Sequence, residues 1–351
     1  MKVISLFSGC GGMDLGFAQA GFEIAYANDI DRDARATYEL NFGMKVDARS
    51  ISKISPNEIP DADGIIGGPP CQSWSLAGSL RGEDDPRGKL FYDYARILAA
   101  KRPLFFVAEN VPGIISSRNI KAFRKITSVL EAPGYSVKWR LIDARDYCVA
   151  QERKRVIIVG FLKELGIEYA YPGPKCTKEG TTIDGYKTGK WPTLKDAIGD
   201  LPEAVPALPS NKPNPKLDVP NHEYMVGAFS PIYMSRNRKR GWDEQSYTIQ
   251  AGGRHAPLHP ESCDMCKVGE DRFEFTGPNY RRLSVREAAR VQSFPDSFIF
   301  KYRNVADGYK VIGNAVPPPL ARAIAESIKN ALGFRGIPEG YKGVESKAKS
   351  H

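Results

Sequence analysis

The chain has 351 residues, of which 42% are hydrophobic and 26% are charged, and its net charge is +9. This length is enough for one or two domains, and the composition excludes a disordered or fibrous protein. The positive charge suits a partner that carries phosphates, although a merely basic protein would look the same. No apolar run approaches membrane-spanning length, so we expect no membrane partner.

Short apolar strands alternate with amphipathic helices in the first half of the chain. Strands are expected at Val3–Phe7, Glu23–Ala27, Gly64–Ile66, Leu104–Val107, Tyr135–Ile142 and Arg155–Phe161. Helices are expected at Met13–Ala20, Asp31–Asn41, Leu90–Ala100 and Ile120–Leu130. This alternation predicts an α/β fold, with a doubly wound and mainly parallel sheet that is covered on both faces.

The pattern changes after Tyr171. Residues 172–221 are rich in Pro, Gly, Asn and Lys and have few periodic segments, which indicates a second, loop-rich domain of the kind that forms binding surfaces. A helix is predicted to begin at Ser284, which forms a capping box with Glu287. The last predicted helix is Pro319–Leu332, and a Gly- and Lys-rich tail that we expect to be flexible follows it.

A glycine-rich loop, Phe7-Ser8-Gly9-Cys10-Gly11-Gly12, joins the first strand to the first helix. Glycine lets the backbone approach a ligand, but the loop lacks the Gly-x-Gly-x-x-Gly spacing of dinucleotide enzymes. Asp29 follows the second strand and suits ribose hydroxyls, while Asp47 suits an adenine amino group. Acidic groups without phosphate-pairing cations favour S-adenosylmethionine; the alternative is that both aspartates are turn or cap residues.

A second loop, Pro69-Pro70-Cys71-Gln72, follows the third strand. Two prolines stiffen this loop, which favours a displayed, nucleophilic Cys71 over a buried structural thiol. Glu109 follows the fourth strand, so both side chains are expected at the same edge of the sheet. The alternative for Glu109 is a helix N-terminal residue. None of the four histidines lies near these motifs, which argues against a Cys–His hydrolase.

Five motifs in the usual order make the chain resemble the bacterial DNA (cytosine-5)-methyltransferases over residues 1 to about 332. They are Phe7–Gly12, Pro69–Gln72, Glu109–Val111, Gln151–Arg155 and Gly313–Val316. The resemblance implies a Rossmann-like, S-adenosylmethionine-dependent methyltransferase domain at 1–165, completed by 305–335. It also implies a smaller, irregular target-recognition domain at 166–304 and a flexible tail at 336–351.

The resemblance also implies roles for individual residues. Cys71 would attack cytosine C6, Glu109 would hold the ring at N3 and the amino group, and Arg153 and Arg155 would orient the base and the carboxylate. The residues expected to hold S-adenosylmethionine are Phe7, Ser8, Gly9, Cys10, Gly11, Gly12, Asp29, Ile30, Asp47, Ala48, Pro70, Asn314 and Val316.

Further segments are similar to the GGCC-specific methyltransferases of the HaeIII type. They are Ser73–Ser75, Asp85–Leu90, Pro220–Tyr224 and Met234–Arg238. This similarity implies that the inner cytosine of GGCC in double-stranded DNA is flipped out and methylated. The expected DNA contacts are Gln72, Ser75, Ile232, Arg236, Arg238, Arg240 and Arg254. Arginine forks match guanine and Ile232 would wedge into the base stack; the alternative is nonspecific phosphate binding.

The cysteines do not form the pattern of a disulfide framework, and the chain begins with a strand pattern that leaves no room for a signal peptide. We therefore expect free thiols and a cytoplasmic location, with Cys148 in the core. The spacing of His255, His259, Cys263 and Cys266 is compatible with zinc, but incidental thiols on a loop are favoured and no metal is expected.

Three alternatives have different requirements. A cytosine-5 methyltransferase that acts on tRNA shares the chemistry, but the arginine-bearing insert favours duplex DNA. An inactive DNA-binding protein would require a broken catalytic set, and a NAD-linked oxidoreductase would require the dinucleotide loop. A monomer suffices because GGCC reads the same on both strands, and a separate endonuclease would complete a restriction–modification system.

Overall fold

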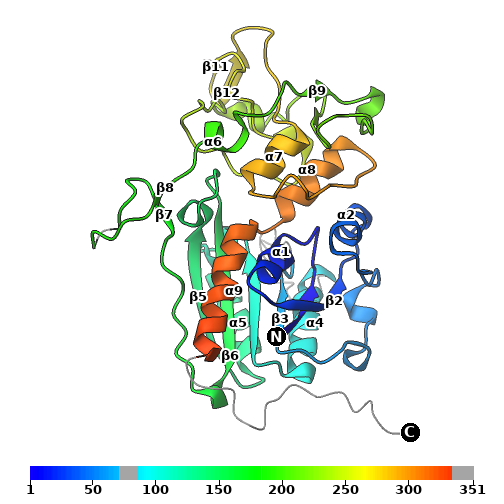
Figure 1. Ribbon diagram of the computed structural model, residues 1–351, viewed down its shortest axis with the longest axis vertical. Helices are drawn as coiled ribbons and strands as arrows, with labels where there is room; N and C mark the ends of the chain where they lie inside the picture. Colours follow the sequence, from blue (N-terminus) through cyan, green and yellow to red (C-terminus); the bar gives the residue numbers. More distant parts are fainter. Residues whose placement is uncertain (71–85, 183, 334–351) are drawn as a thin grey trace.

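The structure, a computed structural model, describes residues 1–70, 86–182 and 184–333. It consists of a lower body built on one large sheet and an upper part that is mostly irregular (Figure 1). Cys71, Gln72 and Ser75 lie outside the described residues, as does the predicted flexible tail at 336–351.

Six strands form the sheet of the lower body. They are β1 (Lys2–Leu6), β2 (Glu23–Asn28), β3 (Gly64–Gly67), β4 (Phe105–Asn110), β5 (Tyr135–Asp143) and β6 (Lys154–Leu162). Their order is β2-β1-β3-β4-β6-β5, and β1 to β4 are parallel. Strand β6 runs antiparallel to both of its neighbours. The predicted α/β sheet is therefore confirmed, and the reversed β6 begins at the edge where the parallel strands end.

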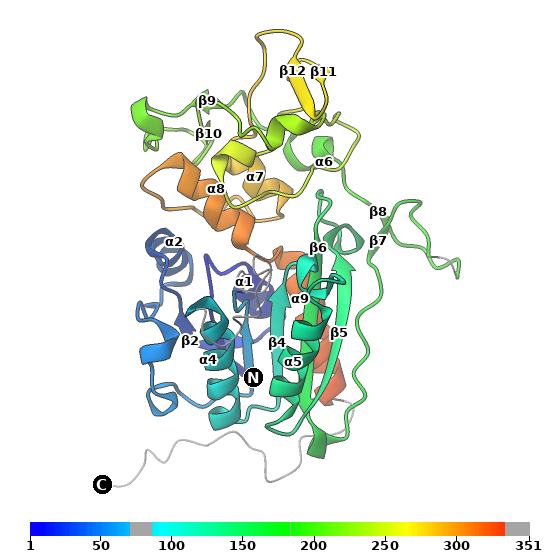
Figure 2. The ribbon, with the colours of Figure 1, turned by 180° about the vertical axis from the view of Figure 1, so that it is seen from behind.

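Helices cover both faces of this sheet. They are α1 (Gly12–Gln19), α2 (Arg32–Phe42), α4 (Pro86–Lys101), α5 (Ile120–Glu131) and α9 (Pro318–Gly333). Phe105 packs on the face covered by α1 and α9, whereas its neighbour Phe106 packs on the face covered by α4 and α5 (Figure 2). This alternation follows from the two-residue period of a strand. No described helix is long and apolar enough to cross a membrane.

Short elements lie between β6 and α9 in the sequence. They are β7 (Cys176–Thr177), β8 (Gly189–Lys190), α6 (Leu194–Ile198), β9 (Val205–Pro206), β10 (Glu223–Tyr224), β11 (Met265–Gly269), β12 (Arg272–Phe275), α7 (Val285–Val291) and α8 (Val305–Asn314). In the upper part, α6, α7 and α8 contribute to a third hydrophobic cluster, and β11 and β12 to a smaller fourth one. Helix α7 begins with the predicted capping box, because Ser284 Oγ accepts from the Glu287 amide and the Glu287 carboxylate accepts from the Ser284 amide. Helix α8 was not predicted.

Two cysteines form a disulfide that was not predicted. Cys148 is exposed and is joined to Cys176 with a Cα–Cα distance of 5.3 Å. A Cβ atom on Gly189 would lie 2.7 Å from Cys176 Sγ, so the strand beside the disulfide has a glycine at the point of closest approach. The prediction that Cys148 is a free core thiol is therefore wrong. Sequence spacing missed this pair because its partners meet only after β6 and the following loop have folded.

Candidate active site

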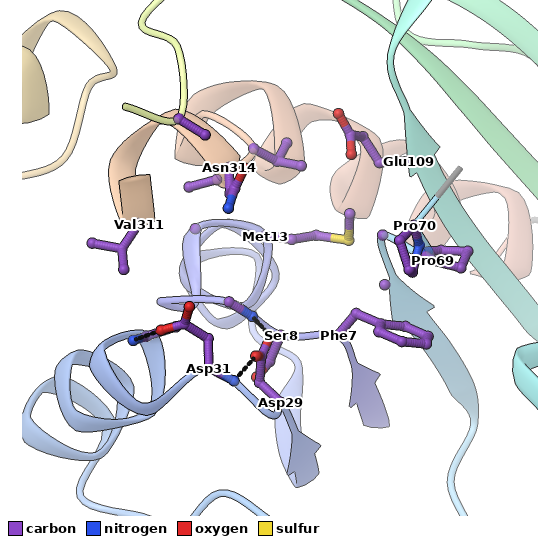
Figure 3. A pocket seen from close by; sticks show the side chains of 18 of the residues that line it. Phe7, Ser8, Met13, Asp29, Asp31, Pro69, Pro70, Glu109, Val311 and Asn314 are labelled. Atoms are coloured by element: carbon purple, nitrogen blue, oxygen red, sulfur yellow. Dashed lines mark hydrogen bonds between the residues drawn. The ribbon is translucent and has the colours of Figure 1, made fainter. Parts of the chain in front are cut away.

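A cavity of about 700 Å³ opens at the edge where β1, β2, β3 and β4 end. Figure 3 shows Asp29 and Asp31 at one end of this cavity and Glu109 with Pro70 at the other. Nine of the predicted cofactor residues line it: Phe7, Ser8, Gly9, Gly12, Asp29, Ile30, Pro70, Asn314 and Val316. The segments 248–251 and 311–316 close it from above.

The glycine-rich loop is held in place by the carboxylate of Asp29. The Gly9 amide donates to one carboxylate oxygen at 2.8 Å, and the Asp31 amide donates to the other at 2.7 Å. Burial raises the pKa of Asp29, and these two amide bonds oppose that shift. A Cβ atom on Gly12 would lie 2.4 Å from the Val316 carbonyl oxygen, so only glycine fits where the loop meets the last helix.

Asp14 is a buried residue of the cavity wall that the sequence did not single out. It lies in the first turn of α1, is completely buried, and accepts a hydrogen bond of 2.8 Å from the Tyr38 hydroxyl. Burial raises the pKa of Asp14 to about 6. The cavity wall therefore holds acidic side chains at both Asp14 and Asp29.

Asp47 does not line the cavity, contrary to its predicted contact with adenine. Its carboxylate pairs with Arg49 at 2.7 Å and accepts from the Tyr26 hydroxyl at 2.9 Å. The hydrogen bonds from Arg49 lower the pKa of Asp47 to about 2. Ser50 and Ile51 reach the cavity instead. Three other predicted cofactor residues are also absent from its lining: Cys10, Gly11 and Ala48.

Cys10 is completely buried beneath the glycine-rich loop, where its thiol donates to the Val311 carbonyl oxygen at 3.4 Å. Burial raises the pKa of this thiol to about 12. Because this thiol is completely buried and does not line the cavity, Cys10 is not placed to attack a substrate.

Glu109 and Arg155 form the ion pair of the site. Their side chains meet at 2.8 Å across the antiparallel β4 and β6, and both line the cavity. Beside them, Asn110 Nδ2 donates to the Pro69 carbonyl oxygen at 3.0 Å. A Cβ atom on Gly68 would lie 3.4 Å from Glu109 Oε2. The residues that lead to Cys71 therefore run directly past the Glu109 carboxylate.

Arg153 lies behind this pair and does not line the cavity. It is completely buried, and its guanidinium donates to the carbonyl oxygens of Gly313, Ala315 and Ile249 at 2.7, 2.8 and 3.1 Å. The three hydrogen bonds of its guanidinium are therefore made to the backbone that surrounds the cavity, and its predicted role in orienting the base stays a prediction. Arg153 holds the turn between α8 and α9, which carries Asn314 and Val316.

The residues predicted to contact DNA differ in exposure and in whether their side chains already bond to other parts of the protein. Ile232 is 74% exposed, and Arg236 and Arg254 are also exposed. Arg238 Nε donates to the Tyr233 carbonyl oxygen at 2.8 Å and so braces its own loop. Arg240 pairs with Glu244 at 2.8 Å and with Glu152 at 3.2 Å. Arg240 therefore joins the upper part to the start of β6.

The four residues of the alternative zinc site do not come together. His259 faces the Glu287 carboxylate at 3.7 Å, and the Cys263 thiol donates to the Gly277 carbonyl oxygen at 3.1 Å. Cys266 is exposed on β11. Within the described part of the chain, no three His, Cys, Asp or Glu side chains are placed to hold a metal.

The chain matches the family model of C-5 cytosine-specific DNA methylases over residues 1–330. It is 53% identical to the Type II methyltransferase M.MthTI of Methanothermobacter thermautotrophicus, with 95% of this chain and 98% of that protein covered. It is 51% identical to the Type II methyltransferase M.NgoPII of Neisseria gonorrhoeae, with 95% and 96% covered.

Solved structures give the same result. A DNA modification methyltransferase encoded within an E. coli prophage superposes with a TM-score of 0.67 at 26% identity, covering 95% of this chain and 99% of that one. The Dnmt2 methyltransferase of S. pombe shares the fold, with a TM-score of 0.62 at 18% identity and coverage of 95% and 98%. The chain therefore belongs to the C-5 cytosine-specific DNA methylases, enzymes that transfer a methyl group from S-adenosylmethionine to cytosine in DNA.

Proposed function

We propose that this methyltransferase modifies the inner cytosine of GGCC, after that base has been flipped out of the duplex and attacked by Cys71. The ion pair between Glu109 and Arg155 is the observation that carries the proposal. It places a carboxylate and a fixed cation at the end of the cavity where the loop that bears Cys71 begins. A base inside a duplex cannot reach this position, so the cytosine must leave the stack.

The cavity fits S-adenosylmethionine, which supplies an electrophilic methyl group. Among the described residues that line the cavity, Arg155 is the one basic side chain, and it is paired with Glu109, so none of these residues offers a free cation to a phosphate. Asp29 keeps lone pairs for ribose hydroxyls after accepting its two amide bonds. Gly12 leaves no room for a side chain because it packs against Val316 and Ala315, so the glycine-rich loop lies directly on the segment that closes the cavity.

The residues divide the chemistry between them. Cytosine C5 is too weak a nucleophile, and addition of the Cys71 thiolate at C6 turns the ring into an enamine that is nucleophilic at C5. Glu109 hydrogen-bonds N3 and the amino group, which limits the charge that builds on the ring. Arg155 holds the carboxylate in position. After methylation the C5 proton leaves and the C6–sulfur bond breaks, which restores both the aromatic ring and Cys71.

We propose 166–304 as the target-recognition domain and 1–165 with 305–335 as the catalytic domain; these bounds assign α8 to the catalytic domain, although it packs with α7 in the upper part. Arg236 and Arg254 are exposed and carry guanidinium forks that match guanine O6 and N7. Arg238 stabilises the loop that presents Arg236 through its bond to Tyr233, and its remaining N–H groups are proposed to donate to DNA. Ile232, which is largely exposed, suits a wedge in the opened base stack. The bonds of Arg240 make it a domain contact rather than a reader of bases.

The names of the relatives as Type II methyltransferases support a place in a restriction–modification system, with an endonuclease that acts separately. The palindromic target allows one copy to modify each strand in turn, so we propose a monomer.

Bisulfite sequencing of plasmid DNA from cells that express the protein tests the target. Protection of the inner cytosine of GGCC is expected, and modification centred on another tetranucleotide would refute the assignment. A GGCC duplex with 5-fluorocytosine at the target tests the covalent step. This substrate should leave an adduct on Cys71, whereas a folded enzyme that methylates plain duplex but yields no adduct would refute the Cys71 route.

A further inference from the structure

Arg282 is a buried arginine of the upper part, with only 3% of its surface exposed. Its three nitrogens donate to three different carbonyl oxygens. Nε donates to Gly253 at 2.8 Å, Nη1 to Met225 at 3.0 Å and Nη2 to Gly227 at 2.8 Å. One side chain therefore ties together two loops, 225–229 and 251–255, that are far apart in the sequence.

The guanidinium also lies on an aromatic ring. Its central carbon is 3.8 Å from the ring centre of Phe229, and that ring stacks on Tyr233 at 4.7 Å. The Tyr233 carbonyl oxygen accepts from Arg238 Nε at 2.8 Å. Contacts therefore run without a gap from Arg282 to the segment 232–238, which presents Ile232 and Arg236.

A second set of contacts leads from Arg282 to Arg254. The Ser230 amide donates to the Arg254 carbonyl oxygen at 3.2 Å. Gly253, whose carbonyl oxygen accepts from Arg282, packs closely on Met225, since a Cβ atom there would lie 2.3 Å from Met225 Sδ and would force that side chain to move. The hydrogen bond from Arg282 to Gly253 therefore holds the loop that presents Arg254 at the residue next to Arg254.

The chemistry explains why an arginine stands here. Carbonyl oxygens that point inward from irregular loops cost free energy unless a donor reaches them. A rigid planar fork can satisfy three of them at once, whereas a lysine ammonium has a flexible stem and no fixed plane. Burial lowers the pKa of Arg282, because removing the charged guanidinium from water costs free energy. The three hydrogen bonds and the contact with the Phe229 ring offset this cost.

We infer that Arg282 is a positioning residue for target recognition, which sets the relative placement of the two loops that present Arg236 and Arg254. It cannot read a base itself, because it is buried. The inference rests on the proposed function, in which these loops read guanine. If Arg282 fixes the distance between the guanidinium groups of Arg236 and Arg254, substituting Arg282 should reduce discrimination between DNA sequences before it abolishes catalysis.

Arg286 provides a matched control. It is also buried, and its nitrogens donate to the carbonyl oxygens of Pro220, Phe298 and Pro295 at 3.0, 3.1 and 3.4 Å. None of these three partners belongs to the loops 225–238 or 251–255. Loss of Arg286 should therefore weaken the fold without changing which base pairs are accepted.

The experiment compares Arg282→Lys with Arg286→Lys at a temperature where both are folded. Single-turnover methylation rates are measured on a GGCC duplex and on duplexes that differ from it by one base pair. For Arg282→Lys, the ratio of these rates should fall about fivefold or more, which is the loss of one good base contact. Binding of S-adenosylhomocysteine by calorimetry should not change. For Arg286→Lys, the melting temperature should fall while the ratio stays at the wild-type value.

An unchanged ratio in folded Arg282→Lys, or an equal loss in Arg286→Lys, would overturn the inference. Should Arg282→Lys fail to fold, Phe229→Leu removes the ring beneath the guanidinium and should also lower the ratio. An unchanged ratio in that variant counts against the inference in the same way. Failure of the proposed function is distinct, because it would show as unaltered discrimination in Arg236→Ala and Arg254→Ala themselves.

Discussion

Arg155 Nε lies 2.8 Å from Glu109 Oε1, across the antiparallel strands β4 and β6. The reversed direction of β6 creates this relationship, because it brings the start of one strand to the end of another. A carboxylate held by a fixed cation is set in position before the substrate arrives, which is the condition for effective stabilisation of developing charge.

Glu109→Gln should lower the methylation rate by about 100-fold or more, because it removes the carboxylate that shares a proton with the cytosine ring. S-adenosylhomocysteine should bind as tightly as to the wild type, since the other end of the cavity is untouched. Single-turnover methylation with labelled cofactor and calorimetry measure the two effects. Equal loss of both would indicate a collapsed cavity instead.

Arg236→Ala or Arg254→Ala should weaken discrimination against a single wrong base pair by about 1–3 kcal/mol. Rates on matched duplexes measure this loss. Arg322→Ala is the control, because Arg322 lies on α9 and pairs with Glu326, away from the upper part. A uniform loss of affinity for all duplexes, with a smaller salt dependence, would identify a phosphate contact instead.

Asp14→Asn should stabilise the cofactor-free protein above pH 6. The pKa of Asp14 is about 6 in the fold, against 3.8 for an ordinary aspartate, so ionisation is less favourable in the fold than in the unfolded chain. Wild-type stability therefore falls as pH rises from about 4 to 6, by up to about 3 kcal/mol from this group. Denaturant titrations of both proteins at pH 4.5 and 8 measure this difference, and a variant gain that is equal at both values would contradict it.

Cys148→Ser should lower the free energy of unfolding by about 3–4 kcal/mol, because the disulfide closes a loop over a sequence separation of 28. A dithiol reductant should lower the melting temperature of the wild type and leave that of the variant unchanged. Cys266→Ser is the control, since Cys266 is a free, exposed thiol. Equal melting temperatures for the wild type with and without reductant would show that the bond does not form.

Gly16→Ala should destabilise the lower body by about 1–3 kcal/mol through overpacking. A Cβ atom at Gly16 would lie 2.5 Å from Ala321 Cβ and 2.5 Å from the Pro318 carbonyl oxygen, so α9 would have to move away from α1. Gly113→Ala is the matched control, because a Cβ atom there would have nothing within 4 Å. Denaturant titration distinguishes the two, and equal stabilities would contradict tight packing of α1 on α9.

The sequence predicted the sheet well because its strands are short apolar runs that end in recognisable polar motifs. It placed Glu109 and the glycine-rich loop at one edge because the carboxyl ends of neighbouring parallel strands meet, whereas Arg155, near the start of the antiparallel β6, was singled out by the family resemblance. Helix α8 could have been predicted, because the Asn304 side chain caps it and its buried residues Val305, Tyr309 and Ile312 recur at helical spacing. Asp31 could also have been predicted as a residue of the cavity, since it was expected to begin a helix beside Asp29 and its carboxylate does cap α2.

Other residues depended on contacts that no local pattern contains. Arg153 and Arg155 look alike in sequence, yet one donates to the turn between α8 and α9 and the other reaches the cavity. Asp47 was expected to follow a strand as Asp29 does, but it forms only an isolated bridge with Asn28, and its carboxylate pairs with Arg49 two residues later. Thr248–Ala251 line the cavity from a segment without regular structure, which periodicity cannot detect.

The packing of α9 on α1 has a consequence for how the enzyme is made. Helix α1 packs on α9, the last helix of the described chain, and Asn314 and Val316 of the turn between α8 and α9 line the cavity. The part of the cavity wall that they form is therefore absent until this late segment has been synthesised. A premature stop anywhere before α8 would remove α9 and expose the apolar face of the sheet that α9 covers. Such a product is expected to be a target for proteolysis rather than a partly active enzyme.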